Sequence, residues 1–347
     1  MIRRVVAHRL FWPLATLALL LALNAAFNPG FWQLRWRDGH LYGSVIDILN
    51  RAAPLVLVSL GMTMVIATRG IDISVGAVVA ISAAIAALMI GGQLVIVDGA
   101  QTMVSRFPMP VAIAAALGVA LLCGLWNGLL VAGVGMQPII ATLILMVAGR
   151  GIAQLITGGQ IITVYYAPYF FLGNGHVLGL PFSLFIAGAV LLALHLALTR
   201  TALGMFVQAI GINPAAARMA GVRQKLITVG TYVFCGFCAG VAGLLVSSNV
   251  KSADGNNAGM LMELDAILAV TLGGTALTGG RFSLAGSVIG ALVIQTLTYA
   301  IYSLGVPPEV NLVVKAVVVF AVMLLQSAEF RRSVAALARR PAVEVRA

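Results

Sequence analysis

The sequence predicts an all-α, polytopic membrane protein, and composition is the first reason. Of its 347 residues, 61% are hydrophobic and 9% are charged, and the mean hydropathy is +1.06. A soluble globular domain carries about a quarter charged residues, so this class is excluded. The second reason is that apolar runs of about 20 residues, the length that crosses a bilayer as a helix, recur along the chain. They predict about ten transmembrane helices.

These apolar runs cover the whole chain. They centre near Leu17, Leu60, Ala80, Leu121, Leu145, Leu191, Tyr232, Ala269, Ile294 and Val319. The first run follows Arg3, Arg4 and Arg9 and in this respect looks like a signal peptide. Because so many apolar runs follow it, we interpret it as an uncleaved first helix.

The distribution of positive charge predicts the topology. If the N-terminus is cytoplasmic, fourteen of the 21 Lys and Arg residues fall on the cytoplasmic side, namely Arg3, Arg4, Arg9, Arg69, Arg200, Arg218, Arg223, Lys225, Arg281, Arg331, Arg332, Arg339, Arg340 and Arg346. The acidic residues Asp38, Asp47, Asp98, Asp254, Glu263, Asp265 and Glu309 fall outside or in outer membrane halves. The positive-inside rule therefore places both termini in the cytoplasm. The net charge of +11 then reflects topology and contact with anionic lipid, and makes no case for nucleic acid.

No linker divides the chain, so we treat residues 1–347 as one membrane domain with short cytoplasmic tails at about 1–10 and 328–347. A weak internal repeat aligns residues 68–79 with residues 278–289, with shared Thr and Gly positions before a similar apolar helix. The span count makes both copies cytoplasmic turns and the duplication parallel, whereas one miscounted span would make it inverted. Paired interrupted segments favour elements that line a transport pathway, although glycines also simply permit a hairpin.

The segment from about 200 to 225 is a polar, basic interruption between two long hydrophobic halves. Within it, Asn213 is a good N-cap, Pro214 fits the first helical position and Gly221 can end a helix. Such a helix would be roughly 10 Å long, too short to cross a bilayer and too short to be stable alone in water. We therefore expect it to dock against another element, which could be another protein.

Ionisable residues inside the predicted spans are few, and each costs about 2.5 to 3.5 kcal/mol at a helix centre on insertion scales. They are Arg51, Asp72, Arg150, Glu263, Asp265 and Lys315. For Arg150 two interpretations stay open: a structural ion pair with Glu263 or Asp265, or a contact to a sugar hydroxyl or a gate.

Uncharged polar residues could line a path for a hydroxylated solute, because amides both donate to and accept from hydroxyl groups without the desolvation cost of a charge. They are Asn50, Asn127, Gln137, Gln154, Gln160, Asn249, Asn256, Asn257 and Gln295. Any one of them could equally form a helix–helix hydrogen bond, but as a set they favour a neutral polar solute over an ion. The candidate pathway or gate residues are Asn50, Arg51, Asp72, Asn127, Arg150, Asn256, Asn257, Glu263 and Asp265.

Motifs of other classes are not supported. Residues 274–281 superficially resemble a phosphate loop, but Gly280 and Arg281 stand where Lys and Ser or Thr are required. The chain has neither a Gly-x-Ser-x-Gly elbow nor a His-Glu-x-x-His motif, so an intramembrane hydrolase or metalloprotease is disfavoured. Cys123, Cys235 and Cys238 fall within spans and are expected to act as small hydrophobic residues. The four histidines have no ligand spacing, and we predict no metal site.

The sequence resembles the ribose-type sugar permeases of bacterial ABC importers. The motifs that carry the resemblance are Gly61-Met62-Thr63, Ile66-Ala67-Thr68, the run from Gly70 to Gly76 (Gly-Ile-Asp-Ile-Ser-Val-Gly) and the run from Ala209 to Val222. Further segments are similar to galactofuranose-type permeases: residues 43–54, 141–151, 256–259 and 263–268. The resemblance covers nearly the whole chain.

This resemblance implies a transport subunit and no enzyme. It implies that the segment from Asn213 to Gly221 is the coupling helix that sits in a groove of a separate ATPase, and it assigns coupling to Gly211, Asn213, Pro214, Ala217, Arg218 and Gly221. One departure is Gln208, where many relatives carry Glu, which puts a charge contact with the ATPase there in doubt. This chain is expected to bind no cofactor itself, because ATP and Mg belong to the ATPase.

The implied partners are that ATPase, a periplasmic sugar-binding protein received by outer loops near Asp38, Lys251 and Asp254, and a second permease, either identical or similar. The expected location is a bacterial inner membrane, and the expected substrate is a monosaccharide, galactofuranose or a pentose such as ribose. Autoinducer-2 or a nucleoside stays open as the substrate, as does an ion-coupled secondary transporter. An intramembrane enzyme or receptor is disfavoured because no nucleophile and base are paired.

Overall fold

The computed structural model describes residues 10–37, 39–97, 100–305, 307–326 and 330. The predicted tails lie almost entirely outside this described part, as do Asp38 and Asp98. The fold is helical, as predicted, and the described residues also form four two-stranded sheets in the connections, which sequence analysis did not predict.

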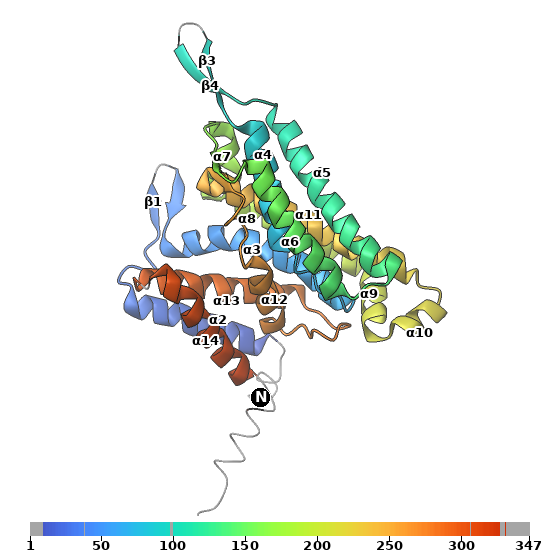
Figure 1. Ribbon diagram of the computed structural model, residues 1–347. Helices are drawn as coiled ribbons and strands as arrows, with labels where there is room; N and C mark the ends of the chain where they lie inside the picture. Colours follow the sequence, from blue (N-terminus) through green and yellow to red (C-terminus); the bar gives the residue numbers. More distant parts are fainter. Residues whose placement is uncertain (1–9, 38, 98–99, 306, 327–329, 331–347) are drawn as a thin grey trace, which may run out of the picture.

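The helices follow one another along the whole described chain (Figure 1). They are α2 (Phe11–Phe27), α3 (Ser44–Ala67), α4 (Val75–Ile90), α5 (Met109–Gly128) continued by the π-helix η1 (Leu129–Val134), α6 (Pro138–Thr157), α7 (Ala167–Asn174), α8 (Phe182–Arg200), α9 (Leu203–Ile212), α10 (Pro214–Met219), α11 (Gln224–Val250), α12 (Met262–Leu272), α13 (Leu284–Ser303) and α14 (Pro308–Gln326). The strands are β1 (Arg35–Arg37), β2 (His40–Tyr42), β3 (Gln93–Val97), β4 (Ala100–Val104), β5 (Ile161–Thr163), β6 (His176–Val177), β7 (Leu180–Pro181) and β8 (Ser252–Asp254).

Length and hydropathy confirm a polytopic membrane protein. Six segments of the described chain are long and apolar enough to cross a membrane: α3, α5 with η1, α6, α8, α11 and α13. Shorter apolar helices include Phe11–Phe27, Val75–Ile90 and Leu312–Ala321, at three further predicted spans. At the remaining predicted span, α12 has 11 residues and extends only about 16 Å. The total of about ten spans and the side on which the termini lie stay predictions.

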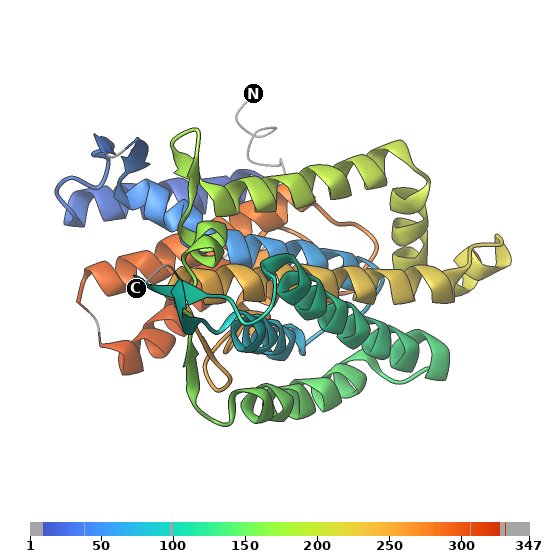
Figure 2. The same cartoon turned by 90° about the horizontal axis from the view of Figure 1, so that it is seen from above.

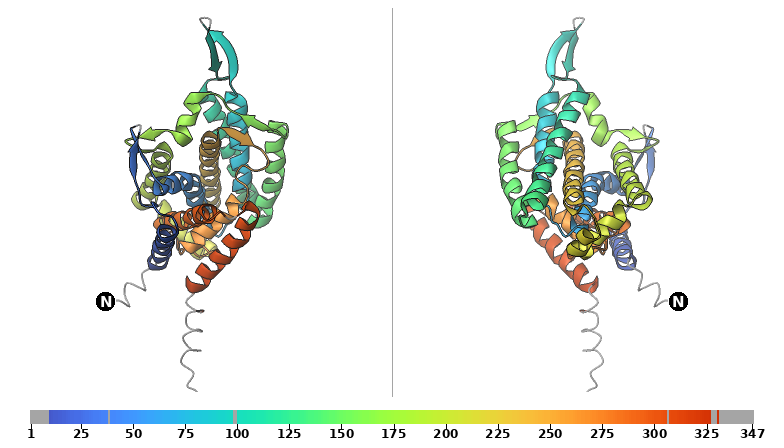
Figure 3. Two further views of the ribbon diagram at one scale, coloured as in Figure 1. Left: turned by 90° about the vertical axis from the view of Figure 1, so that its left-hand side faces the viewer. Right: turned by 90° about the vertical axis from the view of Figure 1, so that its right-hand side faces the viewer.

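Two helices form the centre of the bundle. Within an apolar stretch of 18 residues in each helix, 83% of the residues are buried in α3 and 67% in α11. The corresponding shares are 22% in α5 with η1 and 17% in α8. Helices that are apolar all round are expected in this position. Figure 3, which views the molecule from two opposite sides, shows the gold ribbon of α11 surrounded by the other helices. The outer helices expose apolar side chains to the surroundings, as lipid contact requires.

Small residues allow the central helices to approach closely, as their spacing predicts. A Cβ on Gly236 of α11 would lie 2.5 Å from the carbonyl oxygen of Ala120 on α5. A Cβ on Gly61 of α3 would lie 2.9 Å from the Cα of Cys235. Cys235 and Cys238 are fully buried at this contact, where they act as small packing residues.

The bundle has two distinct ends (Figure 2). At one, which we call the α10 end, α9 turns away from α8 and α10 projects beyond the other helices. At the other, the β1–β2 end, the β1–β2 hairpin contacts the β6–β7 hairpin through a hydrogen bond from the Leu41 amide to the Gly179 carbonyl (3.0 Å). The β3–β4 hairpin projects separately from the bundle (Figure 1).

The two copies of the sequence repeat meet at the α10 end. The amide of Gly280, in the second copy, donates to the carbonyl of Ala67, just before the first copy (2.9 Å). The helices that follow the two copies begin at Val75 and Leu284.

Candidate functional site

The predicted docking helix is present as α10. The Asn213 side-chain oxygen accepts hydrogen bonds from the amides of Ala215 and Ala216, both at 3.1 Å, and so caps its first turn. Pro214 takes the first helical position. Gly221 follows the helix with φ +83°, a left-handed conformation that favours glycine. The sequence thus predicted the bounds and the cap of this helix.

One face of α10 is available for a partner. Ala217 is buried, at 5% exposure, and anchors the helix to the bundle, whereas Met219 is 84% exposed. Arg218 is also exposed. An exposed apolar side chain beside a basic one, on a helix too short to be stable alone, is typical of a docking element.

A tight junction holds the preceding helix α9. A Cβ on Gly211 would lie only 2.0 Å from the carbonyl oxygen of Ala67 and 2.2 Å from the amide of Gly280. The ends of α3 and α9 and the turn before α13 therefore meet at a point that admits no side chain. This junction connects the segment of α9 and α10 to the helices α3 and α13.

Sequence analysis missed one residue of this junction, Arg69, and used it only as a topology charge. Its Nε donates to the Gly211 carbonyl at 2.7 Å and its Nη2 to the Ile212 carbonyl at 2.6 Å. These carbonyls belong to the last turn of α9, where no intrahelical donor remains for them. Arg69 holds φ +65°, which is uncommon for a residue with a side chain. The sequence repeat does single out this position, because it aligns Arg69 with Gly279 and these two residues are in contact in the structure.

A second group of polar residues lines a cleft of about 400 Å³ between α4, α6 and α12. Its lining is Ala77, Met146, Val147, Arg150, Gly151, Gln154 and Glu263. This volume lies within the range of about 300–1,000 Å³ that small-molecule sites usually have. The structure thus brings together the predicted pathway residues Arg150 and Glu263.

Arg150 binds backbone carbonyls and not Glu263 or Asp265, the ion-pair partners that one of its two interpretations predicted. Arg150 Nη1 donates to the carbonyls of Ala258 (2.6 Å) and Gly255 (3.4 Å). Asp265 instead pairs with Lys315 of α14 (2.6 Å), and within the described chain no ion pair of Arg150 with Glu263 or Asp265 is found. The carbonyls at Arg150 belong to the loop that leads into α12, and sequence spacing gives no information about them.

Glu263 is buried at 4% exposure and lies close to α4. A Cβ on Gly76 would meet its Oε2 at 2.2 Å and the carbonyl of Gly259 at 2.4 Å. Gly76, which belongs to the Gly-Ile-Asp-Ile-Ser-Val-Gly run, is therefore needed to admit this carboxylate between α4 and α12.

Asn256 and Asn257 are exposed and organise the loop before α12. The Asn256 amide and the Asn257 side chain donate to the Asp254 carboxylate at 2.8 and 2.7 Å, and Gln154 Nε2 donates to Asn256 Oδ1 at 2.7 Å. Burial alone would raise the pKa of Asp254, but these hydrogen bonds and the nearby Arg150 hold that pKa below its usual value. The loop is thus tied to α6 beside the cleft.

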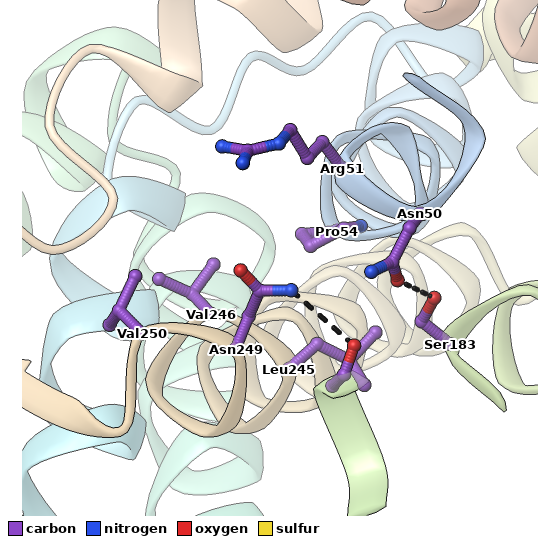
Figure 4. Close-up of a pocket in the computed structure, with 9 residues that line it drawn as sticks. Asn50, Arg51, Pro54, Ser183, Leu245, Val246, Asn249 and Val250 are labelled. Carbon is purple, nitrogen blue, oxygen red and sulfur yellow. Dashed lines mark hydrogen bonds between the residues drawn. The ribbon is translucent and has the colours of Figure 1, made fainter. Parts of the chain in front are cut away.

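Asn50 and Arg51 lie elsewhere, in a cavity of about 100 Å³ between α3, α7, α8 and α11 (Figure 4). The Asn50 side-chain oxygen accepts a hydrogen bond from the Ser183 hydroxyl, and Arg51 Nε contacts the Asp47 carboxylate at 3.0 Å. Asn249 donates to the Gly173 carbonyl at 3.4 Å. The cavity has room for a few water molecules but is smaller than the usual range for a bound solute of about 300–1,000 Å³.

Asp72 and Asn127 are buried away from both of these pockets, at 2% and 0% exposure. Asp72 Oδ1 accepts hydrogen bonds from the amide (3.0 Å) and hydroxyl (2.6 Å) of Ser74 and from Asn127 Nδ2 (3.3 Å). The structure therefore places these two pathway candidates in an internal hydrogen-bonded cluster at the start of α4.

Two histidines without ligand spacing in the sequence meet at the β1–β2 end. His40 of β2 and His176 of β6 stack with ring centroids 3.9 Å apart. Burial and the neighbouring His40 both lower the pKa of His176 below its usual value. The contact joins two hairpins that are far apart in the sequence.

Comparison with known proteins agrees with this architecture. The sequence model of the family described as "Branched-chain amino acid transport system / permease component" matches residues 44–323. The chain is 50% identical to the galactofuranose transporter permease protein of Escherichia coli (strain K12), over 93% of this chain and 92% of that protein. It is 36% identical to the fructose import permease protein of Bifidobacterium longum (strain NCC 2705), over 100% and 95%, and 33% identical to the ribose import permease protein of Escherichia coli (strain K12), over 90% and 92%.

No solved structure matches the chain significantly. The family match covers most of the chain, and the identities to these permeases extend over nearly all of it. Together with the apolar helices, they show that this multi-pass membrane protein belongs to the ribose-type sugar permeases of ABC importers.

Proposed function

We propose that this chain is the permease subunit of an ABC importer that carries a monosaccharide, galactofuranose or a pentose such as ribose, across a bacterial inner membrane. The observation that supports coupling most strongly is the junction of Arg69, Gly211 and Gly280, which joins the exposed helix α10 to the core helices α3 and α13. ATP and Mg are held by a separate ATPase that docks on α10. Movement of α10 is thereby linked to the helices around the pathway.

The remaining partners follow from the two ends of the bundle. The hairpins of the β1–β2 end would receive a periplasmic sugar-binding protein. A second permease, identical or similar, would cover exposed apolar residues of α6 such as Leu143, Val147 and Leu155. These side chains lie on the helix that lines the cleft of Arg150, so a second chain would close the cleft from outside.

The cleft of Arg150, Gln154 and Glu263 is the proposed part of the pathway. A guanidinium donates only, a carboxylate accepts only and an amide does both, so the three together can match the hydroxyl groups of a sugar. Apolar residues Ala77, Met146 and Val147 complete the wall and suit the C–H faces of a sugar ring. Asn50, Arg51, Asp72 and Asn127 lie away from this cleft and are not included.

The test is uptake into proteoliposomes that contain the permease with its co-purifying ATPase and binding protein. Radiolabelled galactofuranose, ribose, a nucleoside, autoinducer-2 and leucine are compared, the last because the family description names amino acids. ATP-dependent uptake of a monosaccharide supports the proposal. ATP-dependent uptake of one of the other solutes alone would contradict the substrate class, and uptake without ATP would indicate a secondary transporter.

A further inference from the structure

A large cationic cleft lies beside α10, and of the residues that form the junction with α9 only Arg69 lines it. It has a volume of about 920 Å³ and lies between η1, α10 and the first turn of α11. Four basic side chains line it: Arg69, Arg218, Arg223 and Lys225. No Asp or Glu is among the described residues that line it, so this positive charge is not balanced within the cleft.

The cleft also has an apolar wall. Val131 and Ala132 of η1 and Leu226 of α11 contribute to its lining, and Leu226 is 65% exposed. A second crevice of about 370 Å³ shares Val222, Arg223 and Leu226 with it and is otherwise lined by Phe206, Ala220, Gly221 and Ile227. A basic cleft therefore adjoins a largely apolar one, with Arg223 at their boundary.

The helix that continues into the apolar wall also indicates where a bilayer would end. Leu122 and Leu125 of α5 are exposed, and the exposed Leu129 continues this apolar surface into η1. Trp126, 53% exposed, lies near the end of this helix. Tryptophan is enriched at the boundary between hydrocarbon and water, so Trp126 marks the headgroup level next to the residues of η1 that line the cleft.

We propose that this cleft binds the headgroup of an anionic phospholipid from the leaflet at the α10 end, with an acyl chain in the adjoining apolar crevice. Clusters of four or more basic residues beside a membrane helix attract anionic lipid. An acidic protein surface would pair with the same charges, but it has no acyl chain to fill the adjoining apolar crevice. A lipid held here contacts both α10 and α11. The anionic lipid is thus positioned to stiffen the attachment of the docking helix.

The test uses the full chain purified in detergent without an ATPase. Native mass spectrometry measures binding of dioleoyl-phosphatidylglycerol and, in parallel, of dioleoyl-phosphatidylethanolamine with the same acyl chains. We expect preferential retention of phosphatidylglycerol. The double variant Arg223→Gln/Lys225→Gln should weaken that retention roughly thirtyfold, since each basic residue near a membrane surface contributes about a factor of five.

A matched control is Arg200→Gln/Arg281→Gln, which removes two charges that do not line the cleft. It should retain phosphatidylglycerol as the unmodified chain does. Equal retention of the two lipids, or an equal loss in both double variants, would overturn the proposal. Competition by millimolar glycerol 3-phosphate would show a site for a soluble phosphate instead. Unchanged lipid retention in Arg223→Gln/Lys225→Gln, with loss of the ATPase when the same variant is purified from native membranes, would assign the cleft to the ATPase.

Discussion

The Arg69 guanidinium donates hydrogen bonds of 2.7 Å to the carbonyl of Gly211 and 2.6 Å to that of Ile212, and so fixes the last turn of α9 to the end of α3. Hydrogen bonds from a charged donor are stronger than neutral ones, and two from one planar group fix an orientation as well as a position. The helix α10, on which we propose that the ATPase docks, begins directly after these carbonyls. Arg69 is therefore a positioning residue for α10.

Replacing Arg69 with glycine tests this role without straining the backbone. Glycine adopts the native φ of +65° easily, which offsets part of the stability lost with the two hydrogen bonds, so the Arg69→Gly chain should still fold and reach the membrane. The two hydrogen bonds are lost, however, and we expect at least a tenfold fall in ATP hydrolysis stimulated by the loaded binding protein. Arg200→Gln at the same end should retain stimulation. Full stimulation in Arg69→Gly would remove Arg69 from the coupling path.

Gly211 should tolerate no side chain. Gly211→Trp must displace the Ala67 carbonyl or the turn at Gly280, so transport should be abolished while the chain still reaches the membrane. Uptake assays and membrane immunoblots measure the two outcomes. The matched control is Gly230→Trp in α11, where a Cβ meets no atom within 4 Å. Similar uptake by both variants would contradict the account of the junction.

The pair of Asp265 and Lys315 should behave as a partly buried ion pair. The two side chains are 25% and 13% exposed, so Lys315→Met alone leaves a carboxylate without its partner and should cost about 3 kcal/mol of stability. The double variant Asp265→Asn/Lys315→Met should recover most of that loss. Thermal unfolding in detergent gives the comparison. Equal stability of the single variant and the unmodified chain would show that the pair contributes nothing.

Arg150 should matter for transport beyond its effect on the loop. Arg150→Lys keeps one charge and a donor to the Ala258 carbonyl, so it should retain part of the uptake, whereas Arg150→Met should lose at least tenfold. Asn50→Ala, in the small cavity outside the proposed pathway, is the control and should transport nearly normally. Greater loss in Asn50→Ala than in Arg150→Met would shift the pathway to the other cavity.

Acid should loosen the contact of His40 with His176. The folded protein lowers the pKa of His176, so its neutral form is favoured there, and this stabilisation is present above the ordinary pKa of about 6.5 and is lost as the pH falls through it. Hydrogen exchange of the Leu41 amide, which bonds the Gly179 carbonyl, reports the contact. Protection should fall between pH 7.5 and pH 5.5 after correction for intrinsic rates. The fall should be smaller in His176→Gln and unchanged in His195→Gln.

The membrane fold and the docking helix were predictable because their signals are local. Hydrophobic runs report spans directly, and Asn213, Pro214 and Gly221 carry the cap, first turn and end of α10 within nine residues. Three of the four small sheets were missed because two or three paired residues give too little alternation to detect.

The contacts of charged residues could not be predicted from sequence. The sequence suggested Asp265 only as a partner of Arg150, and the pairing of Asp265 with Lys315 appears only in the fold, where α14 packs against α13. Arg69 acts on backbone carbonyls, which every residue has, so no sequence pattern identifies its targets. Asp72 was predicted to be a pathway residue because the sequence does not show that Asn127, on α5, would donate a hydrogen bond to it.

The docking of the ATPase on α10 is tested most directly by photocrosslinking. Benzoylphenylalanine is placed at Met219, which is 84% exposed on α10, and in a second variant at Leu178, which is 87% exposed in the β6–β7 turn at the opposite end. In the intact complex we predict that Met219 crosslinks to the ATPase and that Leu178 does not. A crosslink from Leu178 to the ATPase, with none from Met219, would contradict the assignment of α10 and reverse the proposed topology.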